Sequence, residues 1–151
     1  MLLREFGIIV EGIPIICINY RKTGDKTVDF ICKSAVISSI MKFAENLIEP
    51  IESFESNKYH IFFKKSEINT KRTAGAQIIS YGVLDRNISL TQKQKNIFIN
   101  KLEEILSKFI SEYSGLEYSD PSKFKAFVRI IDKIIGSTTK TTEEKVSNLF
   151  F

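Results

Sequence analysis

Several segments of this 151-residue chain are apolar at consecutive positions, and this pattern limits the fold more than any other feature. Residues 5–10 read EFGIIV and residues 13–20 read IPIICINY. Short apolar runs of this kind predict β-strands, whose side chains point alternately to the two faces of a sheet. A sheet with one face in water would alternate polar and apolar residues. We therefore expect helices to cover both faces of the sheet.

The first two strands are predicted to form a hairpin. Glu11-Gly12 separates them and indicates a tight turn, because glycine adopts positive φ without steric cost. Pro14 lies in the second strand and has no N–H group to donate to a neighbouring strand. The second strand is therefore expected at an edge of the sheet.

The middle of the chain is predicted to hold one helix and three more strands. Apolar residues recur with the helical period on about half of the circumference of residues 29–48, and Pro50 ends this helix. The polar segment 66–75 is expected to be a mobile loop. The three strands are expected at residues 52–56, 59–65 and 76–85.

The second helix is predicted to start near Leu90. A capping box marks this start, formed either by Ser89 and Gln92 or by Thr91 and Gln94. In such a box the side chain of the first residue accepts a hydrogen bond from the backbone N–H of the fourth residue. The side chain of the fourth residue accepts one from the backbone N–H of the first. Both pairs have the required spacing, so the sequence leaves the choice open.

A third helix is expected from Asp120-Pro121 to Gly136, because proline is favoured at the first helical position and glycine after the last. The predicted element order is β-β-α-β-β-β-α-α. With helices on both faces of an antiparallel sheet, this order predicts an α/β (α+β) fold, a three-layer α-β-α sandwich. Residues 1–136 would form the domain, and residues 137–151 a tail that is a short helix or disordered.

Composition and charge exclude several classes of protein. The net charge of +4 is a mild excess and lacks the dense basic stripe of a nucleic-acid binder. No apolar run approaches the ~20 residues that span a bilayer, and the N-terminus lacks the features of a signal peptide. We therefore expect a cytoplasmic chain.

The sequence offers little catalytic or metal-binding chemistry. The chain has two cysteines, Cys17 and Cys32, and a single histidine, His60, so a zinc site is not expected. No phosphate-binding loop and no nucleophile elbow is present. We expect no enzyme and no cofactor. A hydrolase would have to use His60, which lies in the middle of a predicted strand.

The order of elements resembles that of the longin, or SNARE-like, domain. A polar strand leads into an aromatic and basic strand, an apolar strand and a long amphipathic helix, as in adaptor small subunits. These segments read ESFESNKYHIFFKK (52–65), AQIISYGVLDRN (76–87) and QKQKNIFINKLEEILSKFISEY (92–113). The related roadblock fold begins with a helix, whereas this chain begins with a hairpin. The resemblance implies a five-stranded sheet in the order 2-1-5-4-3.

This resemblance implies a non-catalytic protein-interaction module. About fifteen residues follow Gly136, too few for the coiled coil of a vesicle SNARE. A stand-alone longin would serve as a subunit in small-GTPase regulation or membrane-trafficking-like assembly. Its partner would be a small GTPase or another longin or roadblock domain, in a homodimer or heterodimer. The expected partner-binding residues, on the first helix and the third strand, are Ile31, Ala35, Ser38, Glu52 and Phe54.

A group of basic residues is the second candidate site. It would dock onto an anionic lipid surface, with peripheral membrane contact, or onto an acidic partner. The alternative is that its lysines prevent edge-to-edge aggregation of strands. The residues are Lys58, His60, Lys64, Lys65, Lys71 and Arg72.

A cytoplasmic small-ligand sensing domain is the alternative function. A cavity between sheet and helix with converging polar groups would favour it, whereas a filled apolar core would favour the interaction module.

Overall fold

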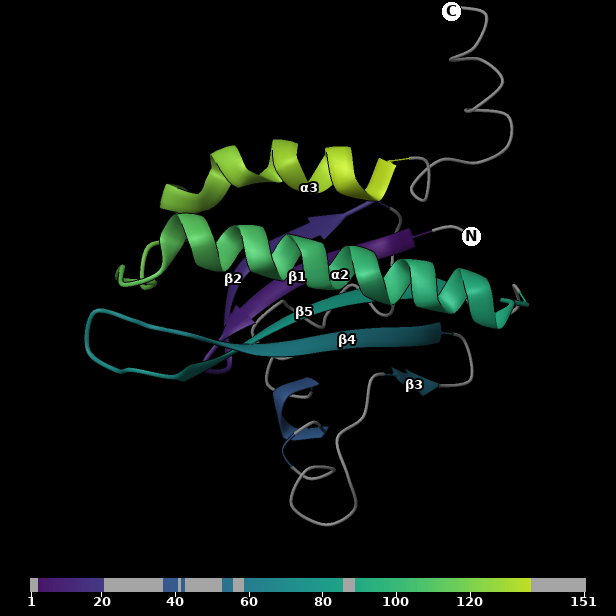
Figure 1. The fold of residues 1–151 in the computed structure, drawn as a ribbon, viewed down its shortest axis with the longest axis horizontal. Helices are drawn as coiled ribbons and strands as arrows, with labels where there is room; N and C mark the ends of the chain where they lie inside the picture. The colour runs from purple at the N-terminus through teal and green to yellow at the C-terminus, as the bar shows by residue number, and fades with distance from the viewer. Residues whose placement is uncertain are drawn as a thin grey trace, which may run out of the picture.

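A single antiparallel sheet organises the chain (Figure 1). The computed structural model describes residues 3–20, 37–40, 42, 53–55, 59–85 and 89–136. The strands are β1 (Leu3–Val10), β2 (Ile13–Asn19), β3 (Ser53–Glu55), β4 (Tyr59–Ile68) and β5 (Ala76–Asp85). Helix α2 (Gln92–Tyr113), the 3-10 helix η1 (Pro121–Phe127) and helix α3 (Val128–Ile135) follow. The strand order is β2-β1-β5-β4-β3, which confirms the expected order.

Hydrophobic cores on both faces of the sheet confirm the three layers. The larger core lies under α2, η1 and α3, where Phe109 contacts the rings of Tyr113, Phe124 and Phe127. The smaller core lies on the other face, where Ile37 of the helical residues 37–40 packs against strand residues. Those strand residues are Ile9, Phe63, Ile79, Tyr81 and Val83. Figure 1 shows residues 37–40 on the side of the sheet away from α2 and α3.

The β1–β2 hairpin has the expected turn and edge position. Glu11 and Gly12 both have positive φ angles, 51° and 78°, as the tightest hairpin turns require. Pro14 lies in the edge strand β2. The register jumps from Ile8↔Ile16 to Ile9↔Pro14, so the residue between them, 15, is an extra residue in a β-bulge.

The second helix begins with one of the two predicted capping boxes. The Thr91 side chain accepts from the Gln94 N–H at 3.2 Å, and the Gln94 side chain accepts from the Thr91 N–H at 2.9 Å. The helix therefore starts at Gln92, and its buried stripe lies over the sheet. The buried residues are Phe98, Leu102, Ile105, Leu106 and Phe109.

The third predicted helix has two parts. Its first seven residues form η1, capped by the Asp120 side chain, which accepts from the Ser122 N–H at 3.1 Å. A 3-10 helix has three residues per turn, so Phe124 and Phe127 lie on the same side and both enter the core. The α-helix begins only at Val128.

The prediction of a mobile loop over residues 66–75 was wrong for residues 66–68. Strand β4 continues to Ile68, which is buried and pairs with Ala76. Residues 69–75 form the actual loop, and it is docked onto the loop after α2. The Gly115 N–H donates to the Asn69 carbonyl at 2.6 Å, and the Lys71 N–H donates to the Leu116 carbonyl at 3.1 Å.

Apart from residues 37–40 and 42, the predicted 29–48 helix lies outside the described residues, and so does the 137–151 tail.

Candidate functional site

The outer edge of β3 is the first candidate surface. This three-residue strand pairs with β4 through Ser53↔Phe62, Phe54↔Ile61 and Glu55↔His60. All three β3 side chains are exposed, and Phe54 keeps 37% of its surface in contact with solvent. Among the described strands, none pairs with β3 on its other side. Backbone groups on such an edge are directed toward an incoming strand.

The structure places two of the five expected partner-binding residues, and they lie at different ends of the sheet. Phe54 is level with Val83 and Glu5 through the paired strands. Ser38 lies instead near the β1–β2 turn, 4.0 Å from the position of a Cβ on Gly12. Seven residues of extended chain separate Glu5 from Gly12, which is roughly 20 Å. Ile31, Ala35 and Glu52 lie outside the described residues.

His60 is not available on the surface as an anion-docking residue. Its exposed fraction is 7%, and its ring stacks on Phe62 with centroids 4.2 Å apart. Its Nδ1 atom lies 3.3 Å from Oε1 of Glu55, across the β3–β4 ladder. The histidine therefore joins β3 to the core under α2.

The remaining basic residues do not form one patch. Lys64 and Lys65 are neighbours in β4, so their side chains point to opposite faces of the sheet. Lys71 and Arg72 lie in the exposed 69–75 loop, beyond the far end of β4 from His60. The ten residues of β4 span roughly 30 Å. Lys58 lies outside the described residues.

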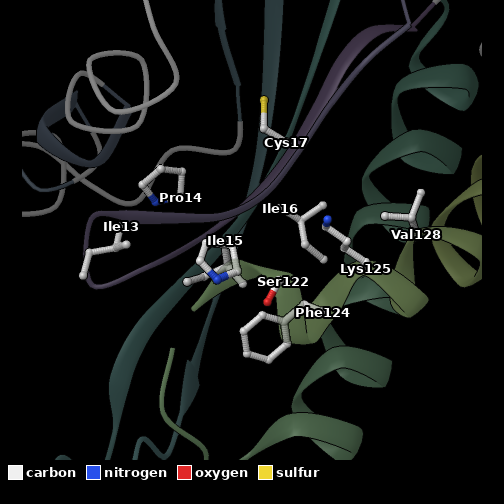
Figure 2. Close-up of a pocket in the computed structure, with 10 residues that line it drawn as sticks. Ile13, Pro14, Ile15, Ile16, Cys17, Ser122, Phe124, Lys125 and Val128 are labelled. Carbon is white, nitrogen blue, oxygen red and sulfur yellow. The ribbon is translucent and has the colours of Figure 1, made fainter. Parts of the chain in front are cut away.

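A cleft lies at the opposite edge of the sheet, between β2 and η1 (Figure 2). Its volume is about 510 Å³. Residues 13–17 of β2 form one wall, and η1 with the first residue of α3 forms the other. At one end the hydroxyl of Tyr20 donates to Oδ1 of Asp132 at 2.7 Å, which ties the end of β2 to α3. The two walls are therefore held at a fixed separation there.

The lining of this cleft is mostly apolar. Ile15, Ile16 and Phe124 are buried and form its floor. Ile13, half of whose surface is exposed at 51%, lies at its rim. The polar side chains among the described lining residues are Ser122 and Lys125, both of η1 (Figure 2). The lining therefore presents an apolar surface with one positive charge, at Lys125, among the described residues.

A buried polar network lies on the other face of the sheet. The hydroxyl of Tyr81 donates to Oε2 of Glu5 at 2.8 Å and lies 3.6 Å from Sγ of Cys17. Burial, with the neighbouring charges of Cys17 and Glu5, raises the pKa of Tyr81 well above its ordinary value. The phenol therefore stays protonated and acts as a donor. This network connects β1, β2 and β5.

Neither this network nor the cleft was predicted from the sequence. A carboxylate in an otherwise apolar strand was the one available signal for Glu5. The cleft joins residues 13–17 to residues 121–128, and no sequence motif links the two segments.

Within the described part of the chain, no group of three His, Cys, Asp or Glu side chains could hold a metal ion. None of the helices described has the length and apolar character to span a bilayer. A scan against protein-family models matches no family, and a search of curated proteins finds no similar protein.

Proposed function

We propose that this chain is a non-catalytic protein-interaction domain of the longin type. It would act as a subunit in small-GTPase regulation or membrane-trafficking-like assembly. The strand order and the helices on both faces support the resemblance to longin domains. The partner would be a small GTPase or a second longin or roadblock domain.

One observation supports this function most directly: β3 ends the sheet with an exposed Phe54 on a three-residue strand. An uncovered edge strand favours pairing with a second chain. Because 37% of Phe54 is still exposed, burying the remainder in such an interface contributes about 1–2 kcal/mol. That energy corresponds to roughly a fivefold to thirtyfold change in the association constant.

The filled core supports the interaction domain over a small-ligand sensor. Phe98, Phe109, Phe124 and Phe127 are fully buried between the sheet and the helices. They occupy the position in which a sensor of this build would hold its ligand.

The test is affinity purification from a lysate of the source organism, followed by mass spectrometry. Recovery of a small GTPase or of a longin or roadblock protein is the expected result. The purified partner, or the chain itself if it self-associates, is then titrated against the wild type and Phe54→Asp. We expect the variant to bind at least tenfold more weakly.

Leu116→Asp is the matched control. Leu116 is also an exposed apolar residue, at 43%, and lies in the loop after α2 that contacts the 69–75 loop, far from β3. Binding that Phe54→Asp leaves unchanged would exclude the β3 surface. The proposed function would be overturned if the chain is a strict monomer and the purification recovers no such partner.

A further inference from the structure

The cleft between β2 and η1 follows an edge strand that has a bulge. Residues 13–17 line it, and Ile15 has no partner in the β1 register. Bulges at sheet edges redirect side chains and interrupt regular pairing. Here the bulge brings both Ile15 and Ile16 into the buried floor, although they are consecutive residues.

The exposure of the residues that line the cleft determines which class of ligand fits. A small-molecule site buries most of its ligand. Of the ten described residues that line this cleft, four are instead exposed: Ile13, Pro121, Ser122 and Lys125. The cleft is therefore suited to a chain that lies along it. Five residues of β2 extend over roughly 16 Å, which matches about five residues of an extended peptide.

The charge of the cleft lining determines which charged side chains that peptide can carry. Among the described residues that line the cleft, Lys125 is the single charged one. Lys125 forms no salt bridge with the described residues. An acidic side chain that enters the cleft would pair with its ammonium group, and a basic one would be repelled.

We propose that the β2–η1 cleft binds an extended segment of a partner protein. Two apolar side chains of that segment, at positions i and i+2, pack against Ile15, Ile16 and Phe124. An Asp or Glu two residues further along the same face pairs with Lys125. This inference rests on the proposed function as an interaction domain, but it uses the edge of the sheet opposite to β3.

The experiment uses the full chain and three blocked, fluorescein-labelled peptides. The probe ETVTLTE presents Val and Leu on one face, with a Glu at either end so that both strand directions are tested. KTVTLTK reverses the charge, and ETSTSTE removes the apolar side chains. We expect ETVTLTE to bind with a Kd below about 1 mM, the range of weak peptide recognition. KTVTLTK should bind about fivefold more weakly, as expected for an exposed ion pair, and ETSTSTE at least tenfold more weakly.

A charge swap localises the contact. Lys125→Glu should reverse the preference, so that KTVTLTK binds about fivefold more tightly than ETVTLTE. Lys123→Glu is the matched control, because Lys123 is exposed on the same 3-10 helix and does not line the cleft. That control should keep the wild-type preference for ETVTLTE over KTVTLTK. Amide chemical shifts should move at the non-proline residues of 13–17 and 121–128.

Several results would overturn the proposal. These are no binding of ETVTLTE up to 1 mM, equal effects of the two lysine variants, or chemical shifts confined to β3. Oleate, a second copy of the chain and a peptide of residues 140–151 are tested as competitors of labelled ETVTLTE. A competitor that displaces the probe at a concentration tenfold lower than unlabelled ETVTLTE requires would be the occupant of the cleft instead. Phe54→Asp reports on the proposed function separately, so the failure of one does not imply the failure of the other.

Discussion

Tyr81 fills the space in which any residue other than glycine at position 7 would place its Cβ. A Cβ built on Gly7 would lie 2.6 Å from Cζ of Tyr81. The two residues face each other in the β1–β5 register. The tyrosine side chain thereby passes over β1, and its hydroxyl reaches Glu5 and Cys17. One side chain thus connects three strands because position 7 has no side chain.

Gly7→Ala should destabilise the fold by about 1–3 kcal/mol, as is usual for overpacking a buried site. The new methyl group would displace the Tyr81 ring and its hydroxyl from Glu5. Urea denaturation measures the loss. In a Tyr81→Ala background the same glycine change should cost at least 1 kcal/mol less, because the clash is absent. Strictly additive effects of the two substitutions would contradict the proposed packing.

The stability of the fold should fall above about pH 10, the ordinary pKa of tyrosine. Burial raises the pKa of Tyr81, so the folded state keeps the phenol proton after the unfolded chain has released it. The stabilisation is complete below that pH and is lost above it, by about 1.4 kcal/mol per pH unit. Tyr81→Phe should make this slope shallower by about 1.4 kcal/mol per pH unit, whereas Tyr20, whose pKa is also raised by burial and by its hydrogen bond to Asp132, keeps its own contribution. Free energies of unfolding between pH 9 and 11 measure it, and parallel wild-type and variant profiles would refute the prediction.

The 69–75 loop should be protected from hydrogen exchange at specific amides. The N–H groups of Lys71, Thr73 and Gly115 all have acceptors across or within the loop contacts. We expect them to exchange at least tenfold more slowly than the amide of the exposed Ala74, because hydrogen-bonded amides exchange only on opening. Amide exchange followed by NMR distinguishes these positions. Equal rates at Gly115 and Ala74 would show that the loop is not docked.

Thr91→Ala should destabilise the fold by about 1 kcal/mol, the usual effect of losing an N-cap. Its hydroxyl accepts the Gln94 N–H, and no described residue replaces that acceptor. Ser89→Ala is the control, because Ser89 belongs to the capping box that the structure does not use. Thermal unfolding compares the two. A larger effect at Ser89 would place the start of the helix two residues earlier.

The sequence predicted the architecture because its signals are local or periodic. Pro14, the two-sided apolar strands and the capping residues each act within a few positions. The end of β4 was missed because Ser66 and Glu67 are polar, and only cross-strand pairing with β5 shows that Ile68 returns to the core.

The candidate sites were less predictable because they depend on register and burial. Phe54 was expected on an edge strand, and the structure places it there. His60 was a candidate for anion docking, but it stacks on Phe62 of the same strand and contacts Glu55 of the paired strand, and both contacts depend on the strand register. The cleft requires η1 to be placed beside β2, and neither segment carries a signal for the other.

The central position of β1 affects how the chain assembles during synthesis. Strand β1 pairs with both β2 and β5, and β5 is synthesised long after β1. The hairpin of β1 and β2 therefore leaves the ribosome before the β5 side of β1 can pair. A two-stranded hairpin is marginally stable alone. Strands β4 and β5 and helix α2 follow one another in the sequence and pack on one another, so their contacts close only short loops. We therefore expect β4, β5 and α2 to form first during synthesis and the hairpin of β1 and β2 to dock onto them afterwards.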